Sequence, residues 1–117
     1  MSKPIILYAE SDPDLLSEQA EVFRHAGYQV KTAVGRRAME AALKQERFDV
    51  AILGHTLSKD DRHHLPYMIK KASEQSRVLV LHNSGRHHAV DLAMDSRRGH
   101  KAVLEAIASL AGELVTA

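Results

Sequence analysis

The sequence predicts an α/β protein in which helices cover both faces of a parallel sheet. Short apolar runs alternate with amphipathic stretches of about 10–15 residues, the length that a helical crossover between parallel strands requires. The densest apolar run, residues 50–53, is followed at once by Gly54, as expected of a strand buried on both faces. Function in such sheets gathers beyond the carboxyl ends of the strands, which draws attention to Gly54 and His55.

The first half of the chain carries clear boundary signals. Asp12 and Pro13 predict a helix start, because Asp caps free N–H groups and Pro fits the first helical position. Gly27 predicts its end, as a glycine that adopts the left-handed conformation. The flanking elements are predicted as strands at residues 4–9, 28–33 and 48–53 and a helix at residues 36–46.

The second half is less regular. Pro66 would disrupt a helix begun much earlier, so the third helix is predicted to begin near Leu65. The remaining elements are predicted as strands at residues 77–81 and 89–94 and a helix from residue 99. Residues 82–89 are fewer than the dozen or so that a helical crossover needs, so we expect a shortened or irregular fourth crossover.

Composition limits the function classes. The 117 residues suffice for one domain, spanning residues 1–117, and the absence of Cys removes disulfides and thiolate catalysis. The net charge is +1, with basic and acidic residues interspersed, which argues against a nucleic-acid-binding surface. No leader or membrane-spanning stretch is present, so we expect a cytoplasmic protein without a membrane partner.

Glu10 comes directly after the first predicted strand, Gly27-Tyr28 precede the second and Phe48-Asp49 open the third. Together with five strands and their helices, these features resemble the CheY-like receiver domain of bacterial two-component response regulators. The resemblance is good over residues 4–81 and loose over residues 82–111. It implies a doubly wound, flavodoxin-like sheet of five strands in the order 2-1-3-4-5. It also implies Mg²⁺-dependent phosphoryl transfer from a histidine kinase to an aspartate at the end of strand three.

The side chains that this chemistry needs are missing from the matching positions. The acceptor falls on Gly54, which has no side chain to phosphorylate, and the acidic metal-binding pair falls on Glu10 and Ser11. The family's Ser/Thr and Lys positions fall on His82 and Asp95. Mg²⁺ usually takes one or two carboxylates plus phosphate oxygens, so we expect its binding to be weak or lost. The chain therefore resembles a degenerate receiver that is not an enzyme and needs no cofactor.

Each of these residues also has a simpler interpretation. We interpret Glu10 as a solvated loop carboxylate and Asp12 as a helix cap, with a remnant acidic pocket as the alternative. We interpret Gly54 beside His55 as a turn requirement, with a redesigned site as the alternative. No metal is expected, although His55, His82 and Glu10 are a speculative ligand set for a metal such as Zn²⁺. Phosphorylation of His55 itself lacks a visible activating base.

The sequence thus predicts a stand-alone pseudo-receiver of a two-component or phosphorelay signal transduction system, acting by phosphorylation-independent protein–protein interaction. Its partners would be a histidine kinase, another signalling protein or a second copy. The family docks partners near its last helix, where a shortened crossover would uncover apolar surface. The expected interface residues are Val103, Leu104, Ile107 and Leu110. The alternatives are a phosphoaccepting regulator that uses a non-standard residue and a histidine-based metal- or pH-responsive module.

Overall fold

The structure, a computed structural model, describes residues 4–82 and 89–116. Five parallel strands form one sheet in the order β2-β1-β3-β4-β5, which confirms the predicted doubly wound fold. The strands are β1 Ile5–Glu10, β2 Gln29–Val34, β3 Val50–Leu53, β4 Arg77–Val80 and β5 Leu92–Ala93. The helices are α1 Pro13–His25, α2 Gly35–Gln45, α3 Lys59–Ala72 and α4 His100–Thr116, with a 3₁₀ turn, η1, at Ser96–Arg98.

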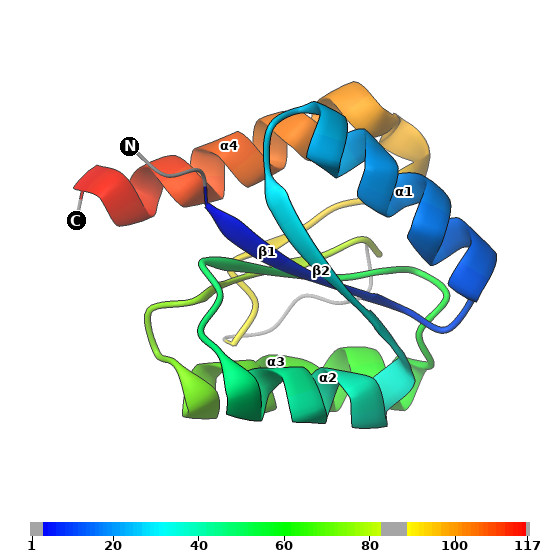
Figure 1. Cartoon of the computed structure of the whole chain (residues 1–117), viewed down its shortest axis with the longest axis vertical. Coiled ribbons are helices and arrows are strands. Elements are labelled where there is room, and N and C mark those ends of the chain that lie inside the picture. Colours follow the sequence, from blue (N-terminus) through cyan, green and yellow to red (C-terminus); the bar gives the residue numbers. More distant parts are fainter. Residues whose placement is uncertain (1–3, 83–88, 117) are drawn as a thin grey trace.

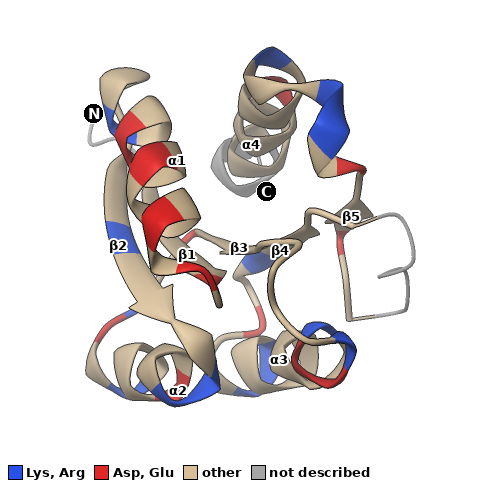
Figure 2. Ribbon diagram, turned by 90° about the vertical axis from the view of Figure 1, so that its right-hand side faces the viewer, with Lys and Arg blue, Asp and Glu red and all other residues tan. Residues whose placement is uncertain are grey.

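The helices form two layers, one on each face of the sheet (Figures 1 and 2). Helices α1 and α4 pack against one face and helices α2 and α3 against the other. Strand β1 has apolar side chains on both faces, which both helix layers can cover. Ile6 and Tyr8 enter the α1/α4 core, while Leu7 and Ala9 enter the α2/α3 core. A strand that buries both of its faces must be apolar at successive positions, which is the pattern that predicted it.

The expected interface on the last helix is wrong. Val103, Ile107 and Leu110 are buried in the α1/α4 core, and Leu104 is partly buried against it. An apolar stripe on a helix has the same period whether it covers a sheet or a partner. Here the stripe covers the sheet beside α1, so these side chains are already used within the chain.

Helix α3 begins at Lys59 rather than near Leu65. The Ser58 side chain accepts the Asp61 N–H at 3.1 Å, and acidic residues in the first turn suit the positive end of the helix. Pro66 lies inside the helix and is buried. Its missing N–H removes one helical hydrogen bond, but its ring contributes to the packed face, so the cap rather than the proline sets the boundary.

The fourth crossover spans residues 81–91, of which residues 83–88 lie outside the described part, and its described residues contain no helix. Asp91 holds the returning chain against β4. Its Oδ2 accepts the Val78 N–H at 2.7 Å and a hydrogen bond from Lys70 Nζ at 2.8 Å. β5 then pairs over Leu92–Ala93 only, a much shorter strand than predicted.

Replacing Asp91 is therefore expected to destabilise the protein. Asp91→Ala leaves the Val78 N–H without its acceptor, which costs about 1–3 kcal/mol of unfolding free energy. Urea denaturation measures this loss. Glu74→Ala, an exposed acidic residue in the loop after α3, is the matched control and is expected to cost under about 0.5 kcal/mol. Equal effects of the two substitutions would contradict the proposed role of Asp91.

Candidate functional site

The predicted site residues gather at the carboxyl edge of the sheet. Glu10 is the last residue of β1, and Gly54 directly follows β3. His82 and Asp95 each lie two residues after the end of a strand, β4 and β5 respectively. Asp49, in contrast, lies at the opposite end of β3, where its Oδ2 accepts the Ile5 N–H at 2.8 Å. The register of β3 is therefore fixed with Gly54, not an aspartate, at the carboxyl end.

The parallel register places Glu10 and Gly54 next to each other. Ala9 pairs with Leu53, and the Gly54 N–H donates to the Ala9 carbonyl at 2.9 Å. Side chains alternate along a strand, so Glu10 points to the same face as Tyr8, two residues before it. Glu10 is 1% exposed, and the interpretation as a solvated loop carboxylate is wrong.

The buried carboxylate of Glu10 is held by three donors. Its Oε1 accepts the Thr56 N–H at 3.0 Å and the Thr56 hydroxyl at 2.7 Å. Its Oε2 accepts a hydrogen bond from the Tyr8 hydroxyl. Burial, followed by this hydrogen bond and the negative charge of Glu10, raises the pKa of Tyr8 well above its ordinary value. The Tyr8 ring is fixed in turn by an edge contact with Phe23, with ring centres 5.2 Å apart.

Thr56 connects the loops that follow β1 and β3. Its Oγ1 accepts the N–H groups of Ser11 at 2.9 Å and Asp12 at 3.2 Å while its proton goes to Glu10. One hydroxyl thus uses its single donor and both lone pairs. Neither Thr56 nor Tyr8 was among the predicted site residues. The available signals were the i, i+2 spacing of Tyr8 and Glu10 and a hydroxyl residue in the loop after β3.

The Glu10 carboxylate lies where a side chain on residue 54 would begin. A Cβ atom built on Gly54 would be 1.8 Å from Glu10 Cδ and 1.9 and 2.0 Å from its two oxygens. Gly54 is not among the glycines with positive φ, which in the described chain are Gly27, Gly35 and Gly99. The interpretation as a turn requirement is therefore wrong, because Gly54 lacks the positive φ that such a turn would need. Its missing side chain leaves the space that the Glu10 carboxylate occupies.

The residues present do not fit the Mg²⁺ ion of the resembled family. Both Glu10 oxygens have donors already, and Asp12 Oδ1 caps α1 by accepting the N–H groups of Asp14 and Leu15, which confirms the predicted cap. Ser11 is exposed and holds Thr56 through its backbone. Gly54 contributes no ligand. A hard cation that needs several oxygens would find few unoccupied ones here.

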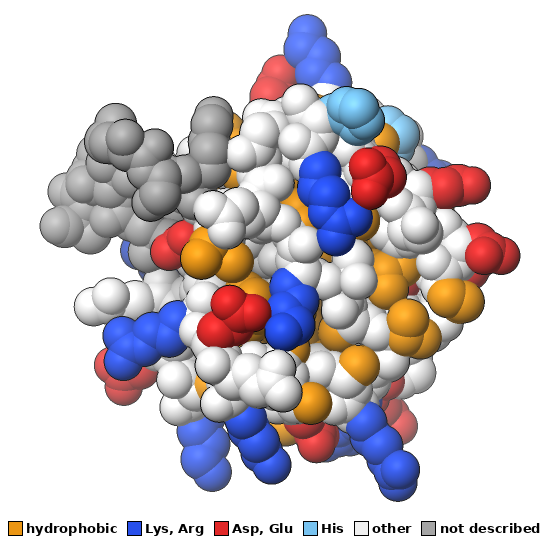
Figure 3. Space-filling view, in the orientation of Figure 1, with side chains coloured by type: hydrophobic (Ala, Val, Ile, Leu, Met, Phe, Trp, Pro, Cys, Tyr) orange, Lys and Arg blue, Asp and Glu red, His pale blue; other side chains and the backbone are white. Residues whose placement is uncertain are grey.

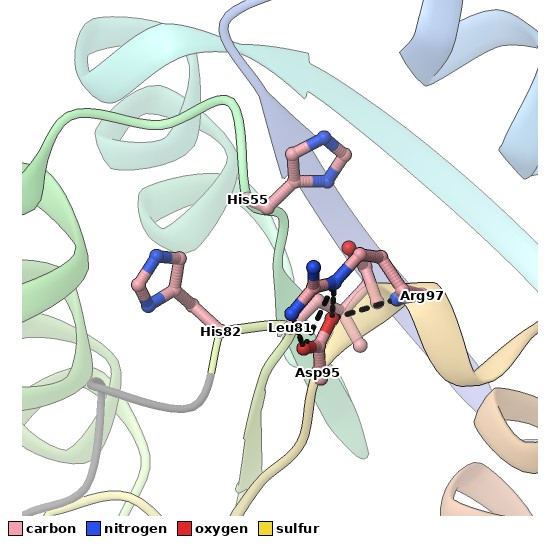
Figure 4. A pocket seen from close by; sticks show the side chains of 6 residues that line it. His55, Leu81, His82, Asp95 and Arg97 are labelled. Atoms are coloured by element: carbon pink, nitrogen blue, oxygen red, sulfur yellow. Dashed lines mark hydrogen bonds and ion pairs between the residues drawn. The ribbon is translucent and has the colours of Figure 1, made fainter.

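His55, His82 and Asp95 line a cavity of about 290 Å³ (Figure 4). It adjoins a cavity of about 170 Å³ that Tyr8 and Glu10 line, and the two share His55, Leu81, Ser96 and Arg97. Asp95 is engaged by Arg97, with Nη2 2.6 Å from Oδ2 and Nε 3.1 Å from each oxygen. Hydrogen bonds from the Arg97 side chain and backbone lower the pKa of Asp95 to about 2. Burial lowers the pKa of His82, and the charge of Arg62 on α3 acts in the same direction.

The speculative metal set of His55, His82 and Glu10 is not assembled. In the part of the chain that the structure describes, no three His, Asp or Glu side chains are placed to hold a metal ion. His55 and His82 line one cavity, whereas Glu10 lines the adjoining one and already accepts hydrogen bonds from Thr56 and Tyr8.

Comparison with known proteins identifies the fold. The chain is similar to a CheY-like response regulator receiver domain from Methanospirillum hungatei, with a TM-score of 0.86, 18% identity and 98% of each chain covered. It is similar to a chemotaxis response regulator of Vibrio cholerae, with a TM-score of 0.78, 14% identity and coverage of 93% and 99%. It also resembles a Burkholderia pseudomallei response regulator that carries a phosphorylated aspartic acid, with a TM-score of 0.77, 17% identity and coverage of 97% and 72%.

These likenesses define the class to which the fold belongs. The chain has the fold of a response regulator receiver domain. No protein-family model matches its sequence, and no curated protein sequence does either. Among the described residues, no helix is both long and apolar enough to cross a membrane.

The contact between Glu10 and Gly54 predicts strong coupling in a double-mutant cycle. Gly54→Ala alone forces the carboxylate off its donors and is expected to cost about 3 kcal/mol or more of unfolding free energy. In the Glu10→Ala background the new methyl group has room, so the two substitutions are expected to couple by about 3 kcal/mol, nearly the whole cost of Gly54→Ala alone, measured by urea denaturation. Gly112→Ala, at an α4 position where an added Cβ meets nothing within 4 Å, is the control, expected to be neutral or stabilising. Costs that simply add would contradict the steric argument.

The raised pKa of Tyr8 predicts a loss of stability at alkaline pH. The unfolded chain releases the Tyr8 proton near pH 10 while the folded chain keeps it, so this residue's contribution is present below pH 10 and falls above it. The slope is about 1.4 kcal/mol per pH unit. Denaturation curves between pH 7 and 11 should show Tyr8→Phe to be less stable at pH 7 but less sensitive to alkali. An unchanged slope in the variant would show that Tyr8 is not protected as described.

Proposed function

We propose that this protein is a pseudo-receiver that transmits signals by binding other proteins, without phosphorylation of the usual acceptor position. The observation that carries the proposal is the Glu10 carboxylate, which fills the space in front of Gly54. A receiver's covalent chemistry needs a nucleophilic carboxylate on that residue. Here a carboxylate is present at the position, but it comes from β1 and is buried.

The rest of the site supports the same proposal. Phosphoryl transfer depends on positioning and on cations that stabilise the charge of the transferred group. The family's Lys position holds Asp95. The nearby cation, Arg97, forms an ion pair with Asp95, so its charge is already neutralised. The family's Ser/Thr position holds His82, an imidazole whose pKa burial lowers. Among the described residues, no three His, Asp or Glu side chains are grouped to hold a metal ion, which supports the proposal.

Glu10 itself is the carboxylate nearest to the lost acceptor, so it is the first residue to consider as a non-standard phosphoacceptor. Its burial and its three donors argue against this alternative. A cavity of about 170 Å³ reaches Tyr8 and Glu10, but both carboxylate oxygens already accept hydrogen bonds, so a phosphoryl group would have to displace Thr56 or Tyr8. The histidine-based metal alternative lacks an assembled ligand set in the described residues.

Without a covalent message, the surface must carry the signal. We propose that the partners are signalling proteins such as a histidine kinase, or a second copy of the chain. The cytoplasmic location and the bacterial two-component context expected from the sequence stay predictions, as does the absence of enzymatic activity.

Intact-mass analysis after incubation with acetyl phosphate and Mg²⁺ tests the proposal. We expect no phosphate adduct on the wild-type chain. Gly54→Asp is also expected to remain unmodified, because its carboxylate competes with Glu10 for one space. The Burkholderia pseudomallei regulator, whose structure carries a phosphorylated aspartic acid, is the positive control. An adduct on the wild-type chain would overturn the proposal in favour of a non-standard acceptor.

A binding measurement tests the second half of the proposal. Proteins that the immobilised chain retains from a bacterial lysate should be the same with and without acetyl phosphate treatment of the chain. Retention only after treatment would contradict phosphorylation-independent binding.

A further inference from the structure

A groove runs between α2 and α3, away from the carboxyl edge of the sheet. The two helices lie side by side on one face (Figures 1 and 2). The cavity between them measures about 410 Å³, within the range of about 300–1,000 Å³ that ligand sites occupy. It is lined by Glu40, Leu43 and Lys44 of α2 and by Met68, Lys71 and Ala72 of α3.

The floor of the groove is apolar and only partly covered. Leu43 and Met68 are half-buried and pack against the α2/α3 core from outside. Ala72 is exposed beside them. Covering this surface would remove apolar area from water, which is favourable. Met68 can adapt its long, unbranched side chain to an incoming group.

The rim of the groove carries unpaired positive charge. Lys44 and Lys71 are exposed, and neither forms an ion pair with a described residue. Glu40 is paired with Arg36 at 3.2 Å, so it does not neutralise them. Lys70, the neighbour of Lys71, turns away to the Ser76 carbonyl and Asp91.

The helix ends do not cancel this charge. Both lysines lie in the last turn of their helices, where each helix end contributes about half a negative charge. Two full positive charges exceed that sum. Lys and Arg side chains also project from the lower edge of the molecule in Figure 3, where the α2–α3 layer lies. The groove therefore favours a ligand with carboxylates beside apolar groups.

We propose that the α2–α3 groove docks an acidic amphipathic segment of a partner protein. Apolar side chains of the segment lie on Leu43 and Met68, and flanking carboxylates meet Lys44 and Lys71. Helix α2, of 11 residues, is about 16 Å long, so a helical segment of two to three turns would span it. The inference rests on the proposed protein-binding role and names the surface that performs it.

A titration of the isotope-labelled full chain, followed by amide NMR shifts, tests the inference. The probe is a synthetic helical peptide with leucines at i, i+4 and i+7 flanked by glutamates. A second peptide replaces every glutamate with lysine. We expect the acidic peptide to shift amides around residues 43–44 and 68–72, and the basic peptide to bind at least about ten-fold more weakly.

Charge reversal supplies the matched variants. Lys44→Glu with Lys71→Glu should weaken binding of the acidic peptide about ten-fold, because attraction becomes repulsion at two exposed contacts. Lys101→Glu, an exposed residue of α4 on the other face of the sheet, should leave binding unchanged. Salt should weaken binding to the wild-type chain, since the contacts are exposed.

Three results would overturn the inference: no binding of the acidic peptide, equal binding of both peptides, or shifts centred outside the groove. Sedimentation of the chain alone provides a fourth such result. A dimer that covers α2 and α3 would show that a second copy of the chain, rather than a partner's acidic segment, occupies the groove. These failures can be told apart from failure of the proposed function, since the mass measurement does not depend on the groove.

Discussion

At the carboxyl edge of the sheet, a buried carboxylate without a cationic partner among the described residues is kept in place by hydrogen bonds alone. Burying such a group costs several kcal/mol unless donors replace the water it loses. The Thr56 amide, the Thr56 hydroxyl and the Tyr8 hydroxyl provide that replacement for Glu10. The arrangement requires the space that any side chain on residue 54 would take, so Gly54 and Glu10 constrain each other.

This constraint links stability to function. The network that satisfies Glu10 also ties together the loops after β1 and β3, since Thr56 accepts the amides of Ser11 and Asp12. Those loops form the site in proteins of this fold class, according to the general rule for open parallel sheets. The Glu10 carboxylate occupies the space beside residue 54, and this occupation is the structural basis of the proposed pseudo-receiver role.

Local signals in the sequence predicted much of the fold. The features that the sequence did not predict depend on contacts between residues far apart in the chain. The Asp12 cap and the Gly27 stop depend on neighbouring residues only, and both are confirmed. The burial of Glu10 depends on β1 extending to residue 10 and on Thr56, 46 residues away. The apolar stripe of α4 was equally compatible with a core and an interface, and the packing beside α1 decides between them. Pro66 led to a predicted helix start that was too late, because the Ser58 cap and the buried packing of α3 set the start of this helix.

The most direct test of the central claim is a crystal structure from crystals grown with magnesium and beryllofluoride, an analogue of a phosphoryl group. The account predicts the Glu10 carboxylate against the Cα of Gly54, bonded to Thr56 and Tyr8, with neither magnesium nor beryllofluoride beside it. A Glu10 side chain turned out of this position, with magnesium and the analogue bound in the vacated space, would contradict the account.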